Sequence, residues 1–139
     1  MSRKASREVV MKLLYQTEIQ KDDYEWQIDY VLNSKHFDIK DIEYIKDVIW
    51  GVLKNKTEID ELIEKHAIGW KLNRISKVDL AILRVGIYEI LFRNDIPYNV
   101  SVNEAVEMAK KYSTEEAGSF INGILSKIPK VQDVKQLSS

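Results

Sequence analysis

The sequence predicts an all-α protein, and three observations support this fold class. Apolar residues recur at intervals of three and four, the spacing that puts side chains on one face of a helix. Strand-like alternation of apolar and polar residues is absent. Glycine (5) and proline (2) are scarce among 139 residues, so long segments can remain helical. About seven helices are expected.

Four helices are expected in the first half of the chain. Residues 3–20 form the first, with Ala5, Val9 and Leu13 spaced four apart, and Asp22 and Asp23 end it. A second helix contains Trp26, Tyr30 and Val31. Asp38 with Asp41 begins a third, which runs to about residue 55, and Thr57 with Asp60 caps a fourth. The apolar residues expected on the buried face of the third are Ile42, Ile45, Ile49, Val52 and Leu53.

Three further helices are expected in the second half. Ser76 and Asp79 have the spacing of a capping box, and residues 78–92 after them are apolar almost all round, which predicts the buried centre of the fold. Ser101 with Glu104 begins the next helix, after Pro97. Ser113 with Glu116 begins the last one, which Pro129 ends.

The chain is expected to form one domain, residues 1–130, followed by a frayed tail, residues 131–139. A break near residues 69–73 divides the domain into two packed helical sub-bundles, of about four helices and then three. The sequence shows no internal repeat.

The composition excludes several classes of protein. Cysteine is absent, which rules out disulfides, zinc–thiolate sites and cysteine nucleophiles. No apolar run approaches the roughly 20 residues of a membrane span, and no signal-peptide core follows the charged N-terminus. The sequence therefore predicts a cytoplasmic protein that does not enter the membrane.

The net charge of −1 conceals an uneven distribution. Residues 1–15 carry a net charge of +3, residues 16–66 hold 13 acids and 7 bases for a net −6, and residues 67–139 carry +2. This asymmetry favours a localised basic surface, although solvated helices also carry such charge by chance.

Signals for an enzyme are poor. The histidines, His36 and His66, are isolated, and the chain has neither a glycine-rich phosphate loop nor a nucleophile elbow. We therefore expect no catalytic residues, no metal and no cofactor.

Signals for RNA binding are better. Arg3 and Arg7 are four residues apart, so they share a helix face, and Lys4 lies beside them. RNA-binding proteins combine such cations with aromatic planes for unstacked bases. The candidate aromatics are Tyr15, Tyr98, Tyr112 and Phe120, each of which could instead belong to the core.

Four segments carry a resemblance to a known family. They are residues 96–112 (IPYNVSVNEAVEMAKKY), 120–125 (FINGIL), 83–89 (LRVGIYE) and 6–15 (SREVVMKLLY). Together they resemble the NusB family of transcription antitermination factors, over about residues 2–130. The resemblance implies a NusB-like fold of two packed helical bundles. It also implies binding to boxA RNA of ribosomal RNA operons together with NusE, a small-subunit ribosomal protein, in an antitermination complex of RNA polymerase and other Nus factors.

The resemblance also assigns residues. Arg3, Lys4 and Arg7 match the family's basic RNA-binding segment, and Asp79 matches an acidic position that faces NusE. The other positions expected near the RNA are Tyr15, Tyr98, Tyr112, Glu116 and Phe120. Three phosphate contacts by the basic segment would give a log–log salt slope of roughly −2 on single-stranded RNA. Asn122 and Gly123 are interpreted as structural, the glycine allowing close helix packing.

Two alternative functions stay open at this stage. One is a helical protein-interaction module without RNA affinity, which the acidic middle segment would suit. The other is a NusB-like domain of the kind fused to ribosomal RNA cytosine methyltransferases, which would need a cofactor-binding domain after residue 139. The oligomeric state, monomer or homodimer, is open as well.

Overall fold

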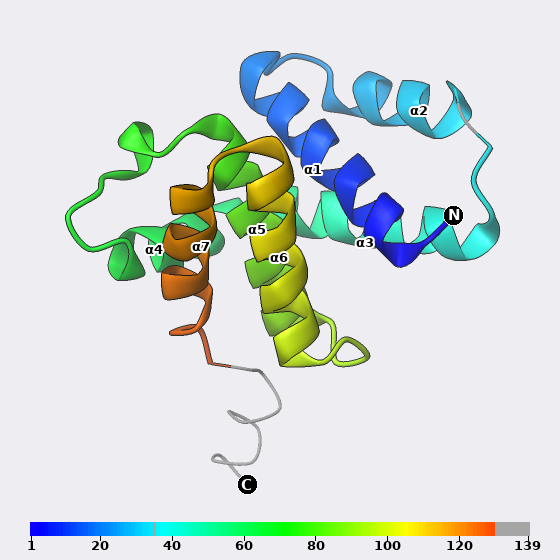
Figure 1. Ribbon diagram of the computed structural model, residues 1–139. Coiled ribbons are helices and arrows are strands. Elements are labelled where there is room, and N and C mark those ends of the chain that lie inside the picture. The colour runs from blue at the N-terminus through cyan, green and yellow to red at the C-terminus, as the bar shows by residue number, and fades with distance from the viewer. Residues whose placement is uncertain (35, 130–139) are drawn as a thin grey trace, which may run out of the picture.

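Seven α-helices form the computed structural model, which describes residues 1–34 and 36–129 (Figure 1). Within these ranges there is no strand, which confirms the all-α prediction. The tail predicted for residues 131–139 lies outside the described residues. The helices are α1 (Arg3–Ile19), α2 (Tyr24–Ser34), α3 (Ile39–Lys54), α4 (Lys56–His66), α5 (Lys77–Phe92), α6 (Tyr98–Tyr112) and α7 (Glu115–Leu125), with a 3-10 turn, η1 (Leu72–Arg74), before α5.

Helix α5 is the centre of the fold, as its apolar sequence predicts. Every residue from 80 to 90 is buried. The helix packs against α1, α3 and α4 on one side and against α6 and α7 on the other. Figure 1 shows α1, α2 and α3 together at one side of the molecule and α5, α6 and α7 at the other. Because burial of a large aliphatic side chain contributes about 1.5–3 kcal/mol, α5 supplies much of the driving force for folding.

Two of the predicted helix starts are confirmed. At α3 the Asp38 carboxylate accepts from the Asp41 amide at 2.9 Å, and the Asp41 carboxylate accepts from the Asp38 amide at 3.3 Å. At α5 the Ser76 hydroxyl accepts from the Asp79 amide at 3.1 Å. These contacts satisfy amides that have no partner within their own helix.

Three other predicted starts are wrong by one to four residues. Helix α4 follows Asn55 rather than Thr57, and α7 is capped by Thr114 rather than Ser113. Helix α6 begins at Tyr98, directly after Pro97, so Ser101 lies inside it. The Ser101 hydroxyl is buried and donates to Glu89, so tertiary contacts use the side chain that the local pattern assigns to a cap.

Helix α2 exposes its large aromatic residues. Trp26 and Tyr30 are 59% and 61% exposed and stack on each other with ring centroids 5.2 Å apart. The residues that it buries are Gln27 and Ile28. The Gln27 amide donates to the carbonyls of Gln20 and Asp22, which fixes the turn between α1 and α2.

Close helix packing depends on glycines other than the one that the sequence suggests. A Cβ atom on Gly123 would meet nothing within 4 Å, so the prediction of close packing there is wrong. A Cβ on Gly86 of α5 would lie 2.9 Å from a methyl of Leu125 in α7, and a Cβ on Gly51 of α3 would lie 2.1 Å from the Tyr88 ring. The short approaches are therefore made by α5 against α3 and α7.

Gly51→Ala is expected to destabilise the protein by about 1–3 kcal/mol, because the methyl group overpacks the Tyr88 ring. The ring cannot move away freely, since its hydroxyl donates to Asp47 at 2.9 Å. In an open helical position the same substitution stabilises by up to about 1 kcal/mol. Urea unfolding measures the change in the free energy of unfolding for Gly51→Ala and for the control Gly123→Ala. Changes of the same sign and size in the two variants would contradict the close packing at Gly51.

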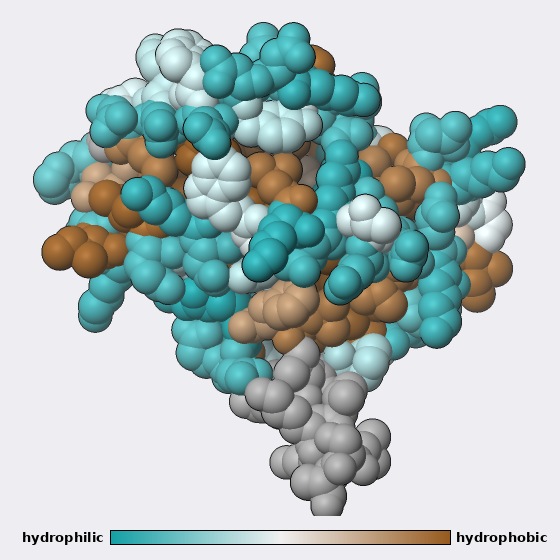
Figure 2. All heavy atoms as spheres, turned by 180° about the vertical axis from the view of Figure 1, so that it is seen from behind, coloured by the Kyte–Doolittle hydropathy of each residue, from teal (hydrophilic) through white to brown (hydrophobic). Residues whose placement is uncertain are grey.

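The surface carries apolar residues in separate patches. Figure 2 shows brown areas interrupted by hydrophilic side chains on the face that it displays. Scattered exposed apolar residues are normal for folded domains. The most exposed are Tyr30, Trp26, Ile39, Ile68 and Trp70.

Candidate nucleic-acid interface

The N-terminal turn of α1 presents two cations to solvent. The Ser2 hydroxyl caps the helix by accepting from the Ala5 amide at 3.1 Å. Arg3 and Lys4 follow in the first turn, and both are exposed. The Arg3 guanidinium carbon lies 4.4 Å from the centroid of the Tyr44 ring, and the Lys4 ammonium lies 4.0 Å from a carboxylate oxygen of Glu104. Both cations are accessible to a phosphate.

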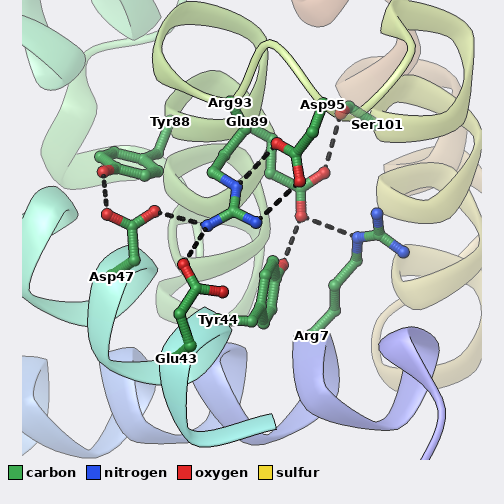
Figure 3. Close-up of polar contacts among 9 residues, drawn as sticks. All are labelled: Arg7, Glu43, Tyr44, Asp47, Tyr88, Glu89, Arg93, Asp95 and Ser101. Carbon is green, nitrogen blue, oxygen red and sulfur yellow. Dashed lines mark hydrogen bonds and ion pairs between the residues drawn. The ribbon is translucent and has the colours of Figure 1, made fainter. Parts of the chain in front are cut away.

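Arg7, one turn further along α1, points into the interior. Only 5% of its side chain is exposed, and its Nε donates to Oε2 of Glu89 at 2.7 Å. Glu89 also accepts from the Tyr44 hydroxyl and, at 2.7 Å, from the Ser101 hydroxyl. Figure 3 shows these donors, from α1, α3 and α6, converging on one carboxylate of α5.

The Glu89 carboxylate changes the titration of its neighbours. Burial by itself would lower the pKa of Arg7, but the hydrogen bond and the charge of Glu89 outweigh it and raise that pKa. Burial raises the pKa of Tyr44, and Glu89 raises it further. Arg7 therefore stays charged and Tyr44 stays a hydrogen-bond donor.

This geometry opposes the phosphate contact that the sequence predicts for Arg7. Glu89 holds Nε of Arg7, breaking this ion pair inside the core would be costly, and the 5% exposed side chain offers a phosphate little surface. The spacing of Arg3 and Arg7 places both on one side of the helix. It cannot show that this side is exposed to solvent at Arg3 and buried in the core at Arg7. Of the three cations of the basic segment, Arg3 and Lys4 are the exposed ones.

Four residues that the sequence analysis did not group form a second polar cluster, where α1 meets the C-terminal end of α6. We call Glu8, Lys12, Lys111 and Tyr112 the Glu8 cluster. Glu8 accepts from the Lys111 ammonium at 2.8 Å and from the Tyr112 hydroxyl at 2.7 Å. The ammonium groups of Lys12 and Lys111 each lie 5.1 Å from the centroid of the Tyr112 ring. The i, i+4 spacing of Glu8 and Lys12 is the only sequence signal for this cluster.

Three of the predicted site residues share one groove. A cavity of about 300 Å³ is lined by residues that include Asp79 of α5 and Glu116 and Phe120 of α7. Trp70, which precedes η1, lines it as well and meets the Phe120 ring edge-on, with centroids 6.0 Å apart. Phe120 is half-buried and Trp70 is 53% exposed, so aromatic surface is open at this groove.

The remaining two aromatics lie elsewhere. Tyr15 is 37% exposed on α1. Tyr98 begins α6, and its hydroxyl donates to the carbonyl of Leu125 at 2.8 Å. Tyr112 ends the same helix, so the two tyrosines are about 20 Å apart along its axis at 1.5 Å per residue. The structure therefore does not bring Tyr98 together with Tyr112.

The described residues hold neither a metal-binding cluster nor a membrane-spanning helix. In residues 1–34 and 36–129, no group of three or more histidine, cysteine, aspartate or glutamate side chains is placed to hold a metal ion. In the same ranges, no helix is both long and apolar enough to cross a membrane.

Comparison with known proteins identifies the family of the chain. Residues 4–130 match the NusB family. The chain belongs to the NusB family. The transcription antitermination protein NusB of Acetivibrio thermocellus is 61% identical over 132 residues, which cover 95% of this chain and 91% of that protein.

Solved structures of NusB proteins have the same fold. T. maritima NusB is similar with a TM-score of 0.87 and 37% identity, covering 100% of this chain and 99% of that one. A NusB chain from a crystal structure of antitermination factors NusB and NusE in complex with double-stranded RNA has a TM-score of 0.82 and 28% identity, covering 94% of this chain and 96% of that one. These likenesses confirm the NusB-like fold that the sequence predicts.

Proposed function

We propose that this chain is an RNA-binding transcription antitermination factor. It binds boxA RNA of ribosomal RNA operons together with NusE, and it works in the cytoplasm with RNA polymerase and the other Nus factors. The observation that carries the proposal is membership of the NusB family over residues 4–130, together with exposed Arg3 and Lys4 at the start of α1. The solved complex of a similar NusB with NusE and RNA supports both partners.

The groove beside Phe120 has features suited to contacts with both the RNA and NusE. Phe120 and Trp70 offer aromatic surface on which an unpaired base can stack. Asp79, the position expected to face NusE, lines the same groove. One of its carboxylate oxygens is buried and has no hydrogen-bond partner among the described residues.

Arg7 takes a different part in this proposal from Arg3 and Lys4. It anchors α1 through Glu89 and thereby positions the helix turn that carries the two exposed cations. Tyr15, Tyr112 and Glu116 stay candidates for RNA contacts. Tyr98 is the weakest candidate, because its hydroxyl donates to the carbonyl of Leu125 at the C-terminal end of α7.

The proposal is tested by the binding of labelled boxA RNA and of a scrambled RNA of the same composition, each with and without NusE. We expect a preference for boxA that strengthens with NusE and weakens with salt. Equal binding to both RNAs, unchanged by NusE, would contradict the proposal. Tight binding to NusE with no gain in RNA affinity would instead support a protein-interaction module.

The double variant Arg3→Gln/Lys4→Gln is expected to make the salt slope for boxA RNA shallower by roughly 1.4, or 0.7 for each lost phosphate contact. The Arg7→Gln variant, in contrast, should keep the slope and lose stability, because its guanidinium is buried. Titrations at four salt concentrations beside urea unfolding separate the two effects. A slope made shallower by roughly 0.7 in Arg7→Gln, the change for one lost contact, would instead place Arg7 at the phosphates.

A further inference from the structure

The Glu8 cluster has the composition of an anion site that is already filled. Two donors of α6, the Lys111 ammonium and the Tyr112 hydroxyl, donate to the Glu8 carboxylate. The Lys12 ammonium of α1 lies beside the Tyr112 ring. Burial by itself would raise the pKa of Glu8, but the bonds from Lys111 and Tyr112 outweigh it and lower that pKa. Glu8 is therefore a permanent anion at neutral pH.

We propose that Lys12, Lys111 and Tyr112 form a binding site for an RNA phosphate, and that the Glu8 carboxylate occupies this site in the free protein as an internal competitor. The inference rests on the proposed function, because it adds a second backbone contact to the same RNA. It assigns binding roles to Lys12 and Lys111 and a restraining role to Glu8.

The chemistry of the donors supports a phosphate. A carboxylate and a phosphate both accept charge-assisted hydrogen bonds from ammonium groups and from hydroxyls. Lys111 already contacts both oxygens of Glu8, at 2.8 and 3.2 Å, so its ammonium faces the pair of oxygens that a phosphate would also present. A phosphate that replaced Glu8 would keep each of these donors paired.

The position of the cluster supports RNA rather than a free anion. Lys4, Glu8 and Lys12 are four residues apart along α1, so they lie on one face of successive turns. Lys4 is one of the two cations proposed to contact the RNA backbone. The Lys111 side chain is 57% exposed and Lys12 is exposed, whereas the Glu8 side chain is 15% exposed. A strand that contacts Lys4 can therefore continue along α1 to Lys12 and Lys111.

The alternative is that the cluster only ties α1 to α6. Lysines in the last turn of a helix interact favourably with its dipole, and Lys110 and Lys111 lie in the last turn of α6. In that case the contacts of Glu8 with the lysines would be purely structural, and the loss of Glu8 would not strengthen RNA binding. The two roles predict opposite results for the same variant.

Glu8→Gln separates them, because glutamine can still accept from Tyr112 but no longer neutralises the lysines. We expect this variant to bind boxA RNA, with NusE present, about fivefold more tightly at low salt. Its salt slope should be steeper by roughly 0.7, for one added effective cation. Lys12→Gln/Lys111→Gln should bind more weakly, with a slope shallower by roughly 1.4.

Matched controls exclude a general effect of charge. Glu61→Gln removes one negative charge, as Glu8→Gln does, and Lys54→Gln/Lys65→Gln removes two positive charges, as the double lysine variant does. All three positions are exposed, on α3 and α4. We expect both controls to bind like the unmodified protein. Thermal unfolding of each variant confirms that the helices stay packed.

Two results would overturn the inference. If Glu8→Gln binds no more tightly than Glu61→Gln, or if the double lysine variant keeps the unmodified slope, the cluster is a tie between helices and no phosphate site. If Arg3→Gln/Lys4→Gln still changes the slope, only this inference fails and the proposed function stands. If the unmodified protein shows no preference for boxA RNA, the proposed function fails and this inference fails with it.

Discussion

Glu89→Ala is expected to lower the free energy of unfolding by about 3–5 kcal/mol, the cost of breaking a buried ion pair. The carboxylate is 1% exposed and accepts from Arg7, Tyr44 and Ser101. Its removal leaves the Arg7 guanidinium charged and unpaired in the core, and it leaves two hydroxyls without their acceptor. Urea unfolding of the variant measures the loss.

Two further variants make this prediction specific. Glu89→Gln keeps an acceptor for the hydroxyls and removes only the charge, so we expect a smaller loss. Glu107→Ala, at an exposed position of α6, should stay within about 0.5 kcal/mol of the unmodified protein. A Glu89→Ala protein as stable as Glu107→Ala would show that the carboxylate does not hold α1, α3 and α6 together.

Arg84→Ala is expected to cost about 3 kcal/mol, since it removes the shared partner of two carboxylates. The Arg84 side chain is 4% exposed, and its guanidinium donates to both oxygens of Asp60, at 2.9 and 3.0 Å, and to Glu18 at 3.2 Å. The variant leaves two partly buried anions of α1 and α4 facing each other. The measurement is urea unfolding at neutral pH, and a loss below that of an exposed Lys65→Ala would contradict the role of the network.

The stability lost in Arg84→Ala should also depend on pH, in a direction that the pKa of Glu18 determines. Burial by itself would raise the pKa of Glu18, but the charges of Arg84 and Lys56 outweigh it and lower that pKa below its ordinary value of 4.5. A lowered pKa in the folded state stabilises the protein above the unfolded-state value, and this stabilisation is lost as the pH falls through the folded-state value. The stability gap between the unmodified protein and Arg84→Ala should therefore be full above the ordinary value of 4.5 and narrow as the pH falls below it. A gap that widens would contradict the assignment.

Much of the fold can be predicted from the sequence because local patterns decide it. The helical period of residues 3–20 and the continuous apolar run of residues 78–92 identify α1 and α5, and the second identifies the centre. Helix starts are predicted well where the side chain serves only as a cap, as at Asp38. They are predicted badly where the same residue type makes a tertiary contact, as Ser101 does with Glu89.

The candidate site is less predictable, because it depends on which way each side of a helix faces. Arg3 and Arg7 are equivalent by spacing, yet one is exposed and the other is the partner of a carboxylate 82 residues away. The groove that joins Asp79 to Phe120 and the cluster that joins Glu8 to Lys111 are formed by helices far apart in sequence. No periodicity within one helix can report such contacts.

The most direct test of the central claim is transcription in vitro through a terminator, on templates with an intact or a scrambled boxA, with RNA polymerase, NusE and the other Nus factors present. We predict that adding this protein raises readthrough on the boxA template alone, and that Arg3→Gln/Lys4→Gln reduces the gain. Readthrough that is unchanged by the protein, or equal on both templates, would contradict an antitermination function.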